Sequence, residues 1–448
     1  MTSRRAPSPR PEDLAHRLQE LSRADNAYWA FSEKDDRDYV HGLFHYPAMM
    51  VPKMQRVLIE ECLAWDPSIS TIYDPFVGSG TVMTEAMLAG RDFVGTDINP
   101  LAILISQAKA GLFDITTFER SLRKVLERVE RDGSEVVDVD FPGRDKWFEP
   151  QVQVALSKLR RSIDRCSDVR VRRFWWVVLA ETTRLVSNSR TSTVKLHIRP
   201  RAEIEARTND AIVTFGYIGR RSVRVLGTQA DLLAERQLLD DGAYIGNIDL
   251  RVADVAKATL DMKNDLLVSS PPYGDNHTTV TYGQAAYLPL QWVRRSDVDA
   301  KATPEYFTNT AAIDSASLGG CRINAMAGVE PLLDRSAGLR TTLDQLASQP
   351  RDRAQRVAVF FTDFDRALNQ ILDAVRTDGL MVWTVGDRSV GGLRVPLAAI
   401  LRQLIGDRAE LVTVLERTIP QSRKRMPTRN LITATMGNEQ ILVLRKTP

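Results

Sequence analysis

The stretch Thr71-Ile-Tyr-Asp-Pro-Phe-Val-Gly-Ser-Gly-Thr81 decides which fold the sequence predicts. Its β-branched start, Thr71–Tyr73, indicates a strand that runs into a glycine-rich turn, and the helical pattern Val82–Ala89 follows. The next strand pattern is Asp92–Thr96, and an acid, Asp97, stands at its end. A strand, a glycine-rich loop, a helix and a second strand in this order are typical of a parallel, doubly wound α/β sheet.

The same alternation continues along the chain. Helical patterns cover Pro100–Ala110 and Phe364–Val375, and strand patterns cover Tyr244–Ile248, Asp265–Val268, Leu380–Val385, Leu411–Leu415 and Gln440–Leu444. This alternation favours an α/β fold with a Rossmann-like, doubly wound sheet. Two segments interrupt it. We expect residues 114–240 to be helical first and β-like around Val194–Val225, and residues 296–356 to form loops and short helices.

The composition limits the class of protein. The 448 residues are 43% hydrophobic and carry a net charge of +3, which excludes an intrinsically disordered chain. No apolar run is long enough to predict a membrane-spanning helix, and Met1–Asp13 lacks the apolar stretch of a secretory signal. The scattered cysteines, Cys62, Cys166 and Cys321, argue against a disulfide framework. We therefore expect a cytoplasmic protein.

Positive charge is concentrated between residues 151 and 200, where eleven Lys and Arg residues stand against three Asp and Glu residues. Most of the arginines fall on two helical patterns, and the second, Val169–Val186, also carries Phe174, Trp175 and Trp176. A basic segment that bears aromatic residues fits a nucleic-acid-binding surface. A solvated helix face accounts for the pattern equally well, so the sequence leaves both interpretations open.

The glycine-rich turn has the properties of a ligand-binding loop. Gly78 and Gly80 allow the backbone to turn tightly and to approach a ligand, and the N-terminus of the following helix adds a positive end. No Lys follows the glycines, so the turn is not a phosphate-binding P-loop. In doubly wound folds an acid placed like Asp97 binds the ribose hydroxyls of a nucleoside-containing cofactor. The loop and the acid together predict such a cofactor.

A second motif, Ser270-Pro-Pro-Tyr273, follows the predicted strand Asp265–Val268. In open α/β sheets, ligands bind at this end of the strands. The two prolines lack N–H groups, which leaves carbonyl oxygens free to accept hydrogen bonds from an amino group. Tyr273 offers a ring face on which a planar base can stack.

At these residues the sequence resembles the amino-methyltransferases of DNA, which methylate cytosine N4 or adenine N6 with S-adenosylmethionine. Asp74–Thr81 looks like the cofactor loop of this family, and Ser270–Tyr273 looks like its catalytic tetrapeptide, with the Ser that is typical of the cytosine-N4 branch. His45–Pro52 is similar to the motif before the cofactor loop, and Glu416–Pro427 with Glu439–Leu444 is similar to the closing hairpin. The resemblance extends from about residue 41 to residue 446.

The resemblance implies a role for each matching residue. The catalytic residues are Ser270, Pro271, Pro272 and Tyr273. The cofactor-binding residues are His45, Tyr46, Pro47, Asp74, Pro75, Phe76, Gly78, Ser79, Gly80, Thr81, Asp97 and Ile98, together with Asp254, placed to bind the adenine amino group. Asp249 and Asp261 lie near enough in the sequence to compete with Asp254 for that role. Contacts with DNA are expected from Arg170, Arg173, Arg190, Lys195, Thr279, Tyr282, Arg423, Lys424 and Arg425.

The resemblance also implies a division of the chain and an antiparallel last strand in the sheet. We expect an N-terminal extension, disordered in part, over residues 1–40, and the cofactor-binding half of a catalytic domain over residues 41–113. A basic insert for DNA recognition covers residues 114–240, and the catalytic loop lies within residues 241–295. Residues 296–356 form a loop-rich insertion that contacts DNA, and residues 357–448 complete the catalytic domain.

The implied activity is methyl transfer from S-adenosylmethionine to the N4 amino group of a cytosine that is flipped out of double-stranded DNA. We expect the enzyme to serve restriction–modification or phage defence, with a partner endonuclease or another defence component. Methylation of adenine N6 or of an RNA amino group remains an alternative, and so does an inactive DNA-binding relative. Methylation of cytosine carbon 5 needs a nucleophilic Cys after Pro, which the sequence lacks. His41 and His45 have no further metal ligands nearby in the sequence, so no metal is expected.

Overall fold

The computed structural model describes residues 10–25, 27–32, 39–258, 263–274, 280–320, 325–420 and 437–448. Four of the residues that were predicted to contact DNA lie outside this part of the chain: Thr279, Arg423, Lys424 and Arg425. Residues 1–9, within the extension that was expected to be disordered in part, lie outside it as well.

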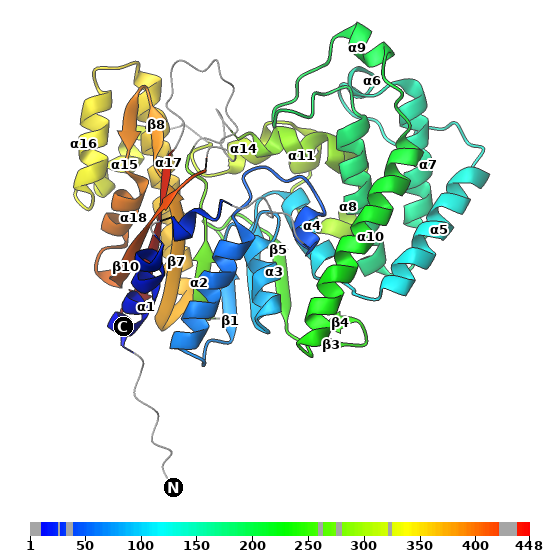
Figure 1. Cartoon of the computed structure of the whole chain (residues 1–448). Coiled ribbons are helices and arrows are strands. Elements are labelled where there is room, and N and C mark those ends of the chain that lie inside the picture. Colours follow the sequence, from blue (N-terminus) through cyan, green and yellow to red (C-terminus); the bar gives the residue numbers. More distant parts are fainter. Residues whose placement is uncertain are drawn as a thin grey trace.

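A seven-stranded sheet forms the centre of the molecule, in the order β10-β11-β7-β6-β1-β2-β5 (Figure 1). The strands β5, β2, β1, β6 and β7 are parallel, and β11 is antiparallel to both β7 and β10. This confirms the predicted doubly wound α/β sheet with an antiparallel last strand. The strands are β1 (Thr71–Asp74), β2 (Asp92–Asp97), β5 (Ile248–Val252), β6 (Asn264–Ser269), β7 (Val375–Gly386), β10 (Ala409–Thr418) and β11 (Asn438–Lys446).

Helices cover both faces of the sheet because neighbouring residues on a strand point to opposite sides. Ile72 and Phe93 are buried in one hydrophobic cluster, whereas Tyr73 and Val94, the next residues along, are buried in another. The first cluster packs under α1 (Pro11–Ala24), α2 (Pro52–Trp65), α3 (Thr81–Leu88) and α4 (Pro100–Lys109), and the second packs under α17 (Arg351–Ala374) and α18 (Leu397–Ile405). Short 3-10 helices are η1 (Tyr28–Ala30), η2 (Tyr39–Gly42) and η3 (Gly406–Arg408).

The insert that precedes β5 is helical and lies beside the β5 edge of the sheet (Figure 1). Its helices are α5 (Ile115–Arg131), α6 (Arg144–Trp147), α7 (Pro150–Asp164), α8 (Val169–Val186), α9 (Arg201–Glu205) and α10 (Ala211–Glu235). The prediction of β structure around Val194–Val225 is therefore wrong. Between Asp114 and Leu238 the strand-type pairing is the single bridge from Ser189 to Ile198.

The physical reason for this error lies in α10. Its β-branched residues favoured a strand, but its buried residues recur at helical spacing and the helix is 25 residues long. Asp210 caps its N-terminus by accepting hydrogen bonds from the N–H groups of Ile212 and Val213. The cap and the apolar stripe outweigh the weak β propensity of the single residues.

The strand expected at Tyr244–Ile248 is also displaced. Ala243–Tyr244 forms β4, which pairs with β3 (Leu239–Asp240) in a separate two-stranded ribbon. The strand that joins the main sheet begins at Ile248, because the register places Ile248 opposite Phe93 of β2. The β-branched composition marked the neighbourhood correctly, but the pairing partner, which lies far away in the sequence, sets the boundary.

The short helices predicted within residues 296–356 are present. They are α12 (Arg295–Val298), α13 (Glu305–Thr308), α14 (Ala312–Ala316), α15 (Ala325–Leu333) and α16 (Ala337–Leu346), and α11 (Tyr282–Gln291) precedes them. The helix that was predicted over Phe364–Val375 begins earlier, as α17 at Arg351. A small hairpin, β8 (Arg388–Val390) with β9 (Leu393–Val395), follows β7.

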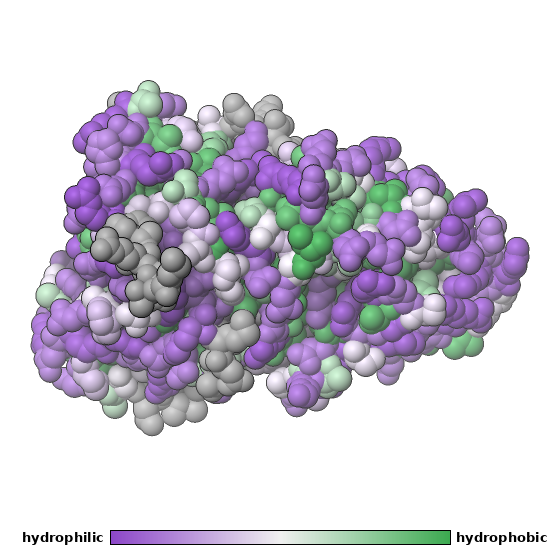
Figure 2. Space-filling view, turned by 90° about the horizontal axis from the view of Figure 1, so that it is seen from below, coloured by the Kyte–Doolittle hydropathy of each residue, from purple (hydrophilic) through white to green (hydrophobic). Residues whose placement is uncertain are grey.

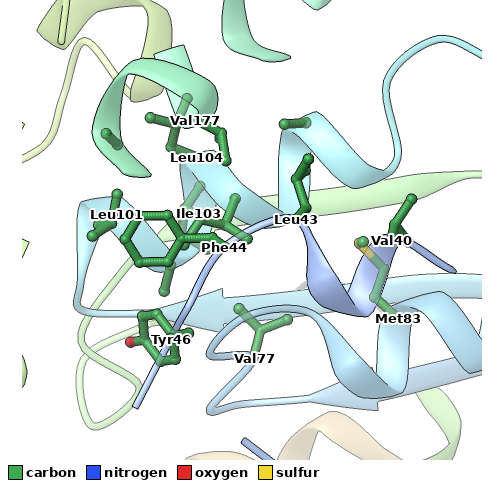
Figure 3. Packing of buried hydrophobic residues seen from close by; sticks show 14 of the residues in the cluster. Val40, Leu43, Phe44, Tyr46, Val77, Met83, Leu101, Ile103, Leu104 and Val177 are labelled. Carbon is green, nitrogen blue, oxygen red and sulfur yellow. The ribbon is translucent and has the colours of Figure 1, made fainter. Parts of the chain in front are cut away.

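The segment from Val40 to Tyr46 crosses the first face of the sheet and is held there by apolar contacts (Figure 3). Val40, Leu43 and Phe44 are buried, and Tyr46 lies beside the glycine-rich loop. The buried neighbours drawn around this segment are Val77, Met83, Leu101, Ile103, Leu104 and Val177. This packing fixes the position of Tyr46 before any ligand is considered.

The face of the molecule seen from below is largely hydrophilic, with scattered apolar groups (Figure 2). Within the ranges that the structure describes, no helix combines the length and the apolar composition that a membrane crossing requires.

Candidate active site

A cavity of about 380 Å³ lies at the edge of the sheet where β1, β2, β5 and β6 end. This is the place where open α/β sheets bind ligands, and the volume is in the usual range for a small-molecule site. Because β11 is antiparallel, its first residues rather than its last lie at this edge. The predicted residues that line the cavity are Tyr46, Pro75, Phe76, Gly78, Ser79, Thr81, Asp97, Ile98, Asp254, Ser270, Pro271, Pro272, Tyr273 and Tyr282.

Two walls of the cavity are distinguished by their residues. The cofactor wall consists of Pro75–Ser79 and Thr81 with Asp97, and the catalytic wall consists of Ser270–Tyr273 with Thr384, Arg417 and Glu439. Among the predicted cofactor-binding residues, His45, Pro47, Asp74 and Gly80 do not line the cavity.

Backbone hydrogen bonds hold the cofactor wall together. The N–H group of Gly78 donates to Asp97 Oδ2 at 2.9 Å, and the N–H group of Asn99 donates to Asp97 Oδ1 at 2.8 Å. Gly80 has a φ of +75°, and a Cβ atom there would lie 2.7 Å from Ser106 Oγ, so this position requires glycine. Burial raises the pKa of Asp97 to about 6, although the backbone hydrogen bonds act to lower it.

Asp74 links the glycine-rich loop to the end of β6, from which the catalytic wall continues. Its carboxylate accepts hydrogen bonds from the Phe76 N–H group at 3.0 Å and from Ser269 Oγ, at the end of β6, at 2.7 Å. Its side chain is fully buried, and burial raises its pKa to about 7. The role of Ser269 was missed, because the sequence motif gave no sign that one serine faces the cavity while its neighbour faces the core.

A buried lysine supports the cofactor wall from behind. Lys109, on α4, is 1% exposed and its Nζ donates to the carbonyl oxygen of Ser79 at 2.6 Å. Burial lowers the pKa of Lys109 to about 7. Lys109 was not among the predicted residues, since a lysine in the last turn of a helix is usually solvated.

Tyr46 closes the cofactor wall on one side. Its hydroxyl oxygen accepts a hydrogen bond from Asn99 Nδ2 at 3.1 Å, and its ring centroid lies 6.0 Å from that of Tyr282. The adjacent His45 uses its backbone N–H group toward Glu181 Oε2, at 3.5 Å. Tyr282, which was predicted to contact DNA, thus lies next to a residue predicted to bind the cofactor.

The hydroxyl group of Tyr273 connects the residues of the catalytic wall. Tyr273 Oη lies 3.2 Å from Ser270 Oγ, 3.1 Å from Glu439 Oε1 and 3.4 Å from the carbonyl oxygen of Thr384. Burial and the charge of Glu439 raise the pKa of Tyr273 well above its ordinary value, so the phenol stays protonated. The chain leaves the motif through Gly274, whose φ is +79° and where a Cβ atom would lie 2.5 Å from Arg388 Nη1.

Asp254 lies in the cavity wall beyond β5, and its carboxylate already has two partners. Its Oδ1 accepts from the N–H group of Ala256 at 3.0 Å, and its Oδ2 forms an ion pair with Lys257 Nζ at 2.9 Å. Lys257 is 83% exposed, so solvent and ligand can compete for that oxygen. The contact of Asp254 with an adenine amino group remains a prediction.

The loop-rich insertion supplies another part of the cavity lining that the sequence did not reveal. Asp314 accepts hydrogen bonds from the N–H group of Gly283 and thereby fixes the start of α11 against α14. Burial raises the pKa of Asp314 to about 6. The apolar lining residues of this part and of the segment after Tyr46 are Ile313, Ala316, Leu318, Ala48, Met49, Met50, Val51 and Met54.

The predicted DNA-contacting arginines of the insert form contacts within the protein. Arg170 pairs with Asp168 at 2.9 Å, and Arg173 Nε donates to the carbonyl oxygen of Asp297 at 2.6 Å. Burial lowers the pKa of Arg173. Arg190 and Lys195 lie in the bent segment between Ser189 and Ile198. None of these four lines the cavity, and their role toward DNA remains a prediction.

The segment that carries Arg190 and Lys195 contacts α11, whose first residue, Tyr282, lines the cavity. The N–H group of Leu196 donates to Gln284 Oε1 at 3.1 Å, and Gln284 lies on α11, two residues after Tyr282. A substrate-binding surface on this segment would therefore be continuous with the cavity.

The residues of the cavity fit S-adenosylmethionine. Asp97 offers a carboxylate for ribose hydroxyls, and aromatic and methionine side chains provide an apolar surface for adenine. Ser79 lines the cavity, and its buried hydroxyl has no hydrogen-bond partner in the described part of the protein, as expected of a group that awaits a ligand. The described ranges contain no cluster of three or more His, Cys, Asp or Glu residues that could hold a metal ion.

Comparison with known proteins supports the class of DNA amino-methyltransferases. Residues 6–108 match the family model N6_N4_Mtase, described as DNA methylase. That family and the fold together imply the use of S-adenosylmethionine.

Two relatives are named as Type II methyltransferases. The chain is 28% identical to the Type II methyltransferase M.MvaI of Kocuria varians over 444 residues, which cover 96% of this chain and 94% of that protein. It is 30% identical to the Type II methyltransferase M.MjaII of Methanocaldococcus jannaschii over 118 residues, which cover 26% and 22% of the two chains. Among solved structures, the rRNA methyltransferase aviRa from Streptomyces viridochromogenes aligns over 90% of this chain and 89% of its own, but with 10% identity and a TM-score of 0.29.

Proposed function

We propose that this protein transfers a methyl group from S-adenosylmethionine to the N4 amino group of a cytosine in double-stranded DNA. The observation that carries the proposal is that the Ser-Pro-Pro-Tyr loop and the cofactor wall line the same cavity. A serine at the first position of that loop is typical of the cytosine-N4 branch of the family that the sequence resembles.

On the cofactor wall, Asp97 would accept hydrogen bonds from the ribose hydroxyls, and Gly78 and Ser79 would lie along the methionine portion. When bound, the cofactor supplies an activated methyl group on a positively charged sulfur. The residues of this chain then act chiefly by positioning the amino nitrogen for in-line attack.

On the catalytic wall, Ser270 Oγ and the Pro271 carbonyl oxygen would accept hydrogen bonds from the amino group. These bonds favour a tetrahedral nitrogen whose lone pair is localised and can attack the methyl carbon. Tyr273 would hold the base by stacking. Because an amino group inside a stacked duplex would not reach the cofactor, the proposed reaction includes flipping of the cytosine out of the helix.

The proposed biological setting is restriction–modification or phage defence, with a cognate endonuclease as partner. The relatives supporting this setting are named as Type II methyltransferases. Protection of a DNA sequence against that endonuclease would be the expected consequence of methylation.

Nucleoside mass spectrometry on DNA incubated with the protein and S-adenosylmethionine tests the proposal. N4-methylcytosine is the expected product. N6-methyladenine would instead assign the enzyme to the adenine alternative, and methylated RNA alone would assign an RNA substrate. Cofactor binding without methylation of any nucleic acid would support the inactive DNA-binding relative.

A further inference from the structure

The hydroxyl group of Tyr273 belongs to a chain of polar groups that the proposed mechanism has not used. One end is Ser270 Oγ, which faces the cavity, and the other is the carboxylate of Glu439 on β11. Tyr273 and Glu439 are 166 residues apart in the sequence. The side chain of Glu439 is only 12% exposed, so this is an interior contact rather than a surface one.

The direction of the hydrogen bonds along this chain follows from counting protons. The phenol of Tyr273 has one proton, and the carboxylate of Glu439 and the carbonyl group of Thr384 can only accept. Ser270 Oγ can accept as well, but the charged carboxylate of Glu439 is the strongest and nearest of these acceptors, so the phenol proton goes to it. Tyr273 Oη then has lone pairs that can accept the proton of Ser270, whose Oγ lies 3.2 Å away, and this assignment leaves the lone pairs of Ser270 Oγ for the cavity.

A buried arginine keeps the Glu439 carboxylate in place as a hydrogen-bond acceptor for Tyr273. Arg417 on β10 forms an ion pair with Glu439 Oε2, and its Nε donates to the carbonyl oxygen of Trp29 at 3.1 Å. The guanidinium group, 6% exposed, stabilises the negative charge on Glu439 and fixes its orientation. Glu439 thus remains an acceptor.

We propose that Glu439, held by Arg417, is a positioning residue that acts through Tyr273 to make Ser270 a hydrogen-bond acceptor toward the substrate. This inference rests on the proposed function and adds a source of specificity. An amino group donates to Ser270 Oγ, whereas a carbonyl oxygen at the same place, as in thymine or uracil, finds no proton there and is repelled. The chain of hydrogen bonds thereby selects bases that carry an exocyclic amine.

The decisive variant is Glu439→Gln, which keeps the size of the side chain but introduces an amide donor and removes the ion pair. The phenol proton of Tyr273 is then free to turn toward Ser270, which sends the Ser270 proton into the cavity. We expect kcat for methyl transfer to fall roughly 10- to 100-fold, while the Kd for S-adenosylmethionine stays within about twofold. In a Ser270→Ala background the same change should cause no further loss, because its effect passes through Ser270.

Glu416→Gln is the matched control. Glu416 lies on β10, pairs in register with Gln440 beside Glu439, and accepts from Gln440 Nε2 at 2.6 Å. The variant makes the same chemical change on the exposed part of this hairpin, so kcat should be that of the unaltered protein. If Glu439→Gln does not fold, as judged by thermal melting, Tyr273→Phe keeps the ring, removes the hydroxyl and should give a comparable loss of kcat.

Two results would overturn the inference while the proposed function stands. The first is full turnover by Glu439→Gln or, where that variant does not fold, by Tyr273→Phe. The second is that Glu439→Gln lowers kcat by the same factor with Ser270 present and in the Ser270→Ala background. A failure of the unaltered protein to methylate any amino group is a different result, since it overturns the proposed function itself. The mass-spectrometric assay on the unaltered protein separates these cases.

Discussion

The two walls of the cavity are held in place by different means. On the cofactor wall, Gly78 and Asp97 are 19 residues apart and are joined by a hydrogen bond from the backbone N–H group of Gly78 to the Asp97 carboxylate. On the catalytic wall, Tyr273 and Glu439 are 166 residues apart and are joined through side chains. The first wall is therefore set by local sequence, whereas the second depends on the whole sheet being assembled. Variants that damage one wall and spare the other test this difference.

The largest effect is expected from Ser270→Ala on the catalytic wall. The variant removes an acceptor for the substrate amino group, so turnover should fall by about 100-fold or more, in line with the loss of a transition-state hydrogen bond. The Kd for S-adenosylmethionine should change by less than about twofold. Single-turnover methylation and calorimetric titration measure the two quantities, and unchanged turnover would contradict the role of the catalytic wall.

The next largest effect is expected from Asp97→Ala on the cofactor wall. Loss of the carboxylate removes the acceptor for the ribose hydroxyls and the anchor of Gly78, so cofactor affinity should fall roughly 10- to 100-fold. Asp249→Asn is a suitable control, because Asp249 lies on the adjacent β5 but pairs with Arg251 instead. An unaltered Kd in Asp97→Ala, measured by isothermal titration, would refute the ribose role.

A smaller effect should follow from pH. Because burial raises the pKa of Asp97 from 3.8 to about 6, its carboxylate is ionised above that pH and protonated below it. A protonated carboxyl accepts ribose hydrogen bonds poorly, so cofactor affinity should fall by about tenfold for each pH unit below 6. Titrations between pH 8 and pH 5 measure the change. Asp97→Asn should flatten this dependence, and a profile that keeps its slope in the variant would point to another group.

The smallest effect concerns the insert, outside both walls. Reversing Arg170 and Arg173 to Glu should weaken DNA binding a few-fold and flatten the dependence of log affinity on log salt by about one to two units. The effect is expected to be modest, because both residues have partners within the protein. Reversal of Arg10, which precedes α1, and of Arg23, on α1, provides the same change of charge elsewhere. An equal slope in both variants would assign the insert arginines to structure.

The contrast between the walls also explains how far the sequence could predict the site. Asp74–Thr81 and Asp97 could be found because a strand, a loop and the next strand are neighbours in sequence and in space. Glu439 could not, since Tyr273 lies in the loop after β6, 166 residues away in the sequence, and nothing in the sequence around Glu439 marks it as polar and buried. Ser269 and Ser270 likewise differ only in the side of the strand to which they point.

For the fold, alternation of strand and helix predicted the sheet well, and propensity failed where it was used alone. The segment Val194–Val225 was assigned β structure from its β-branched residues, although the spacing of its buried residues is helical. The start of β5 at Ile248 was misplaced because pairing with β2 decides it. In the first case residue spacing and a cap outweigh the propensity of single residues, and in the second a strand distant in sequence sets the boundary.

The position of β11 has a consequence for biosynthesis. This strand lies between β7 and β10 and is translated after every other strand of the sheet. Until it leaves the ribosome, β10 has no partner through which to join the sheet, and Tyr273 lacks its carboxylate. A nascent chain could therefore complete the cofactor wall early, but it would acquire the catalytic wall only as its final step of folding. Incomplete chains would thus lack the contact between Tyr273 and Glu439 on which the proposed methyl transfer depends.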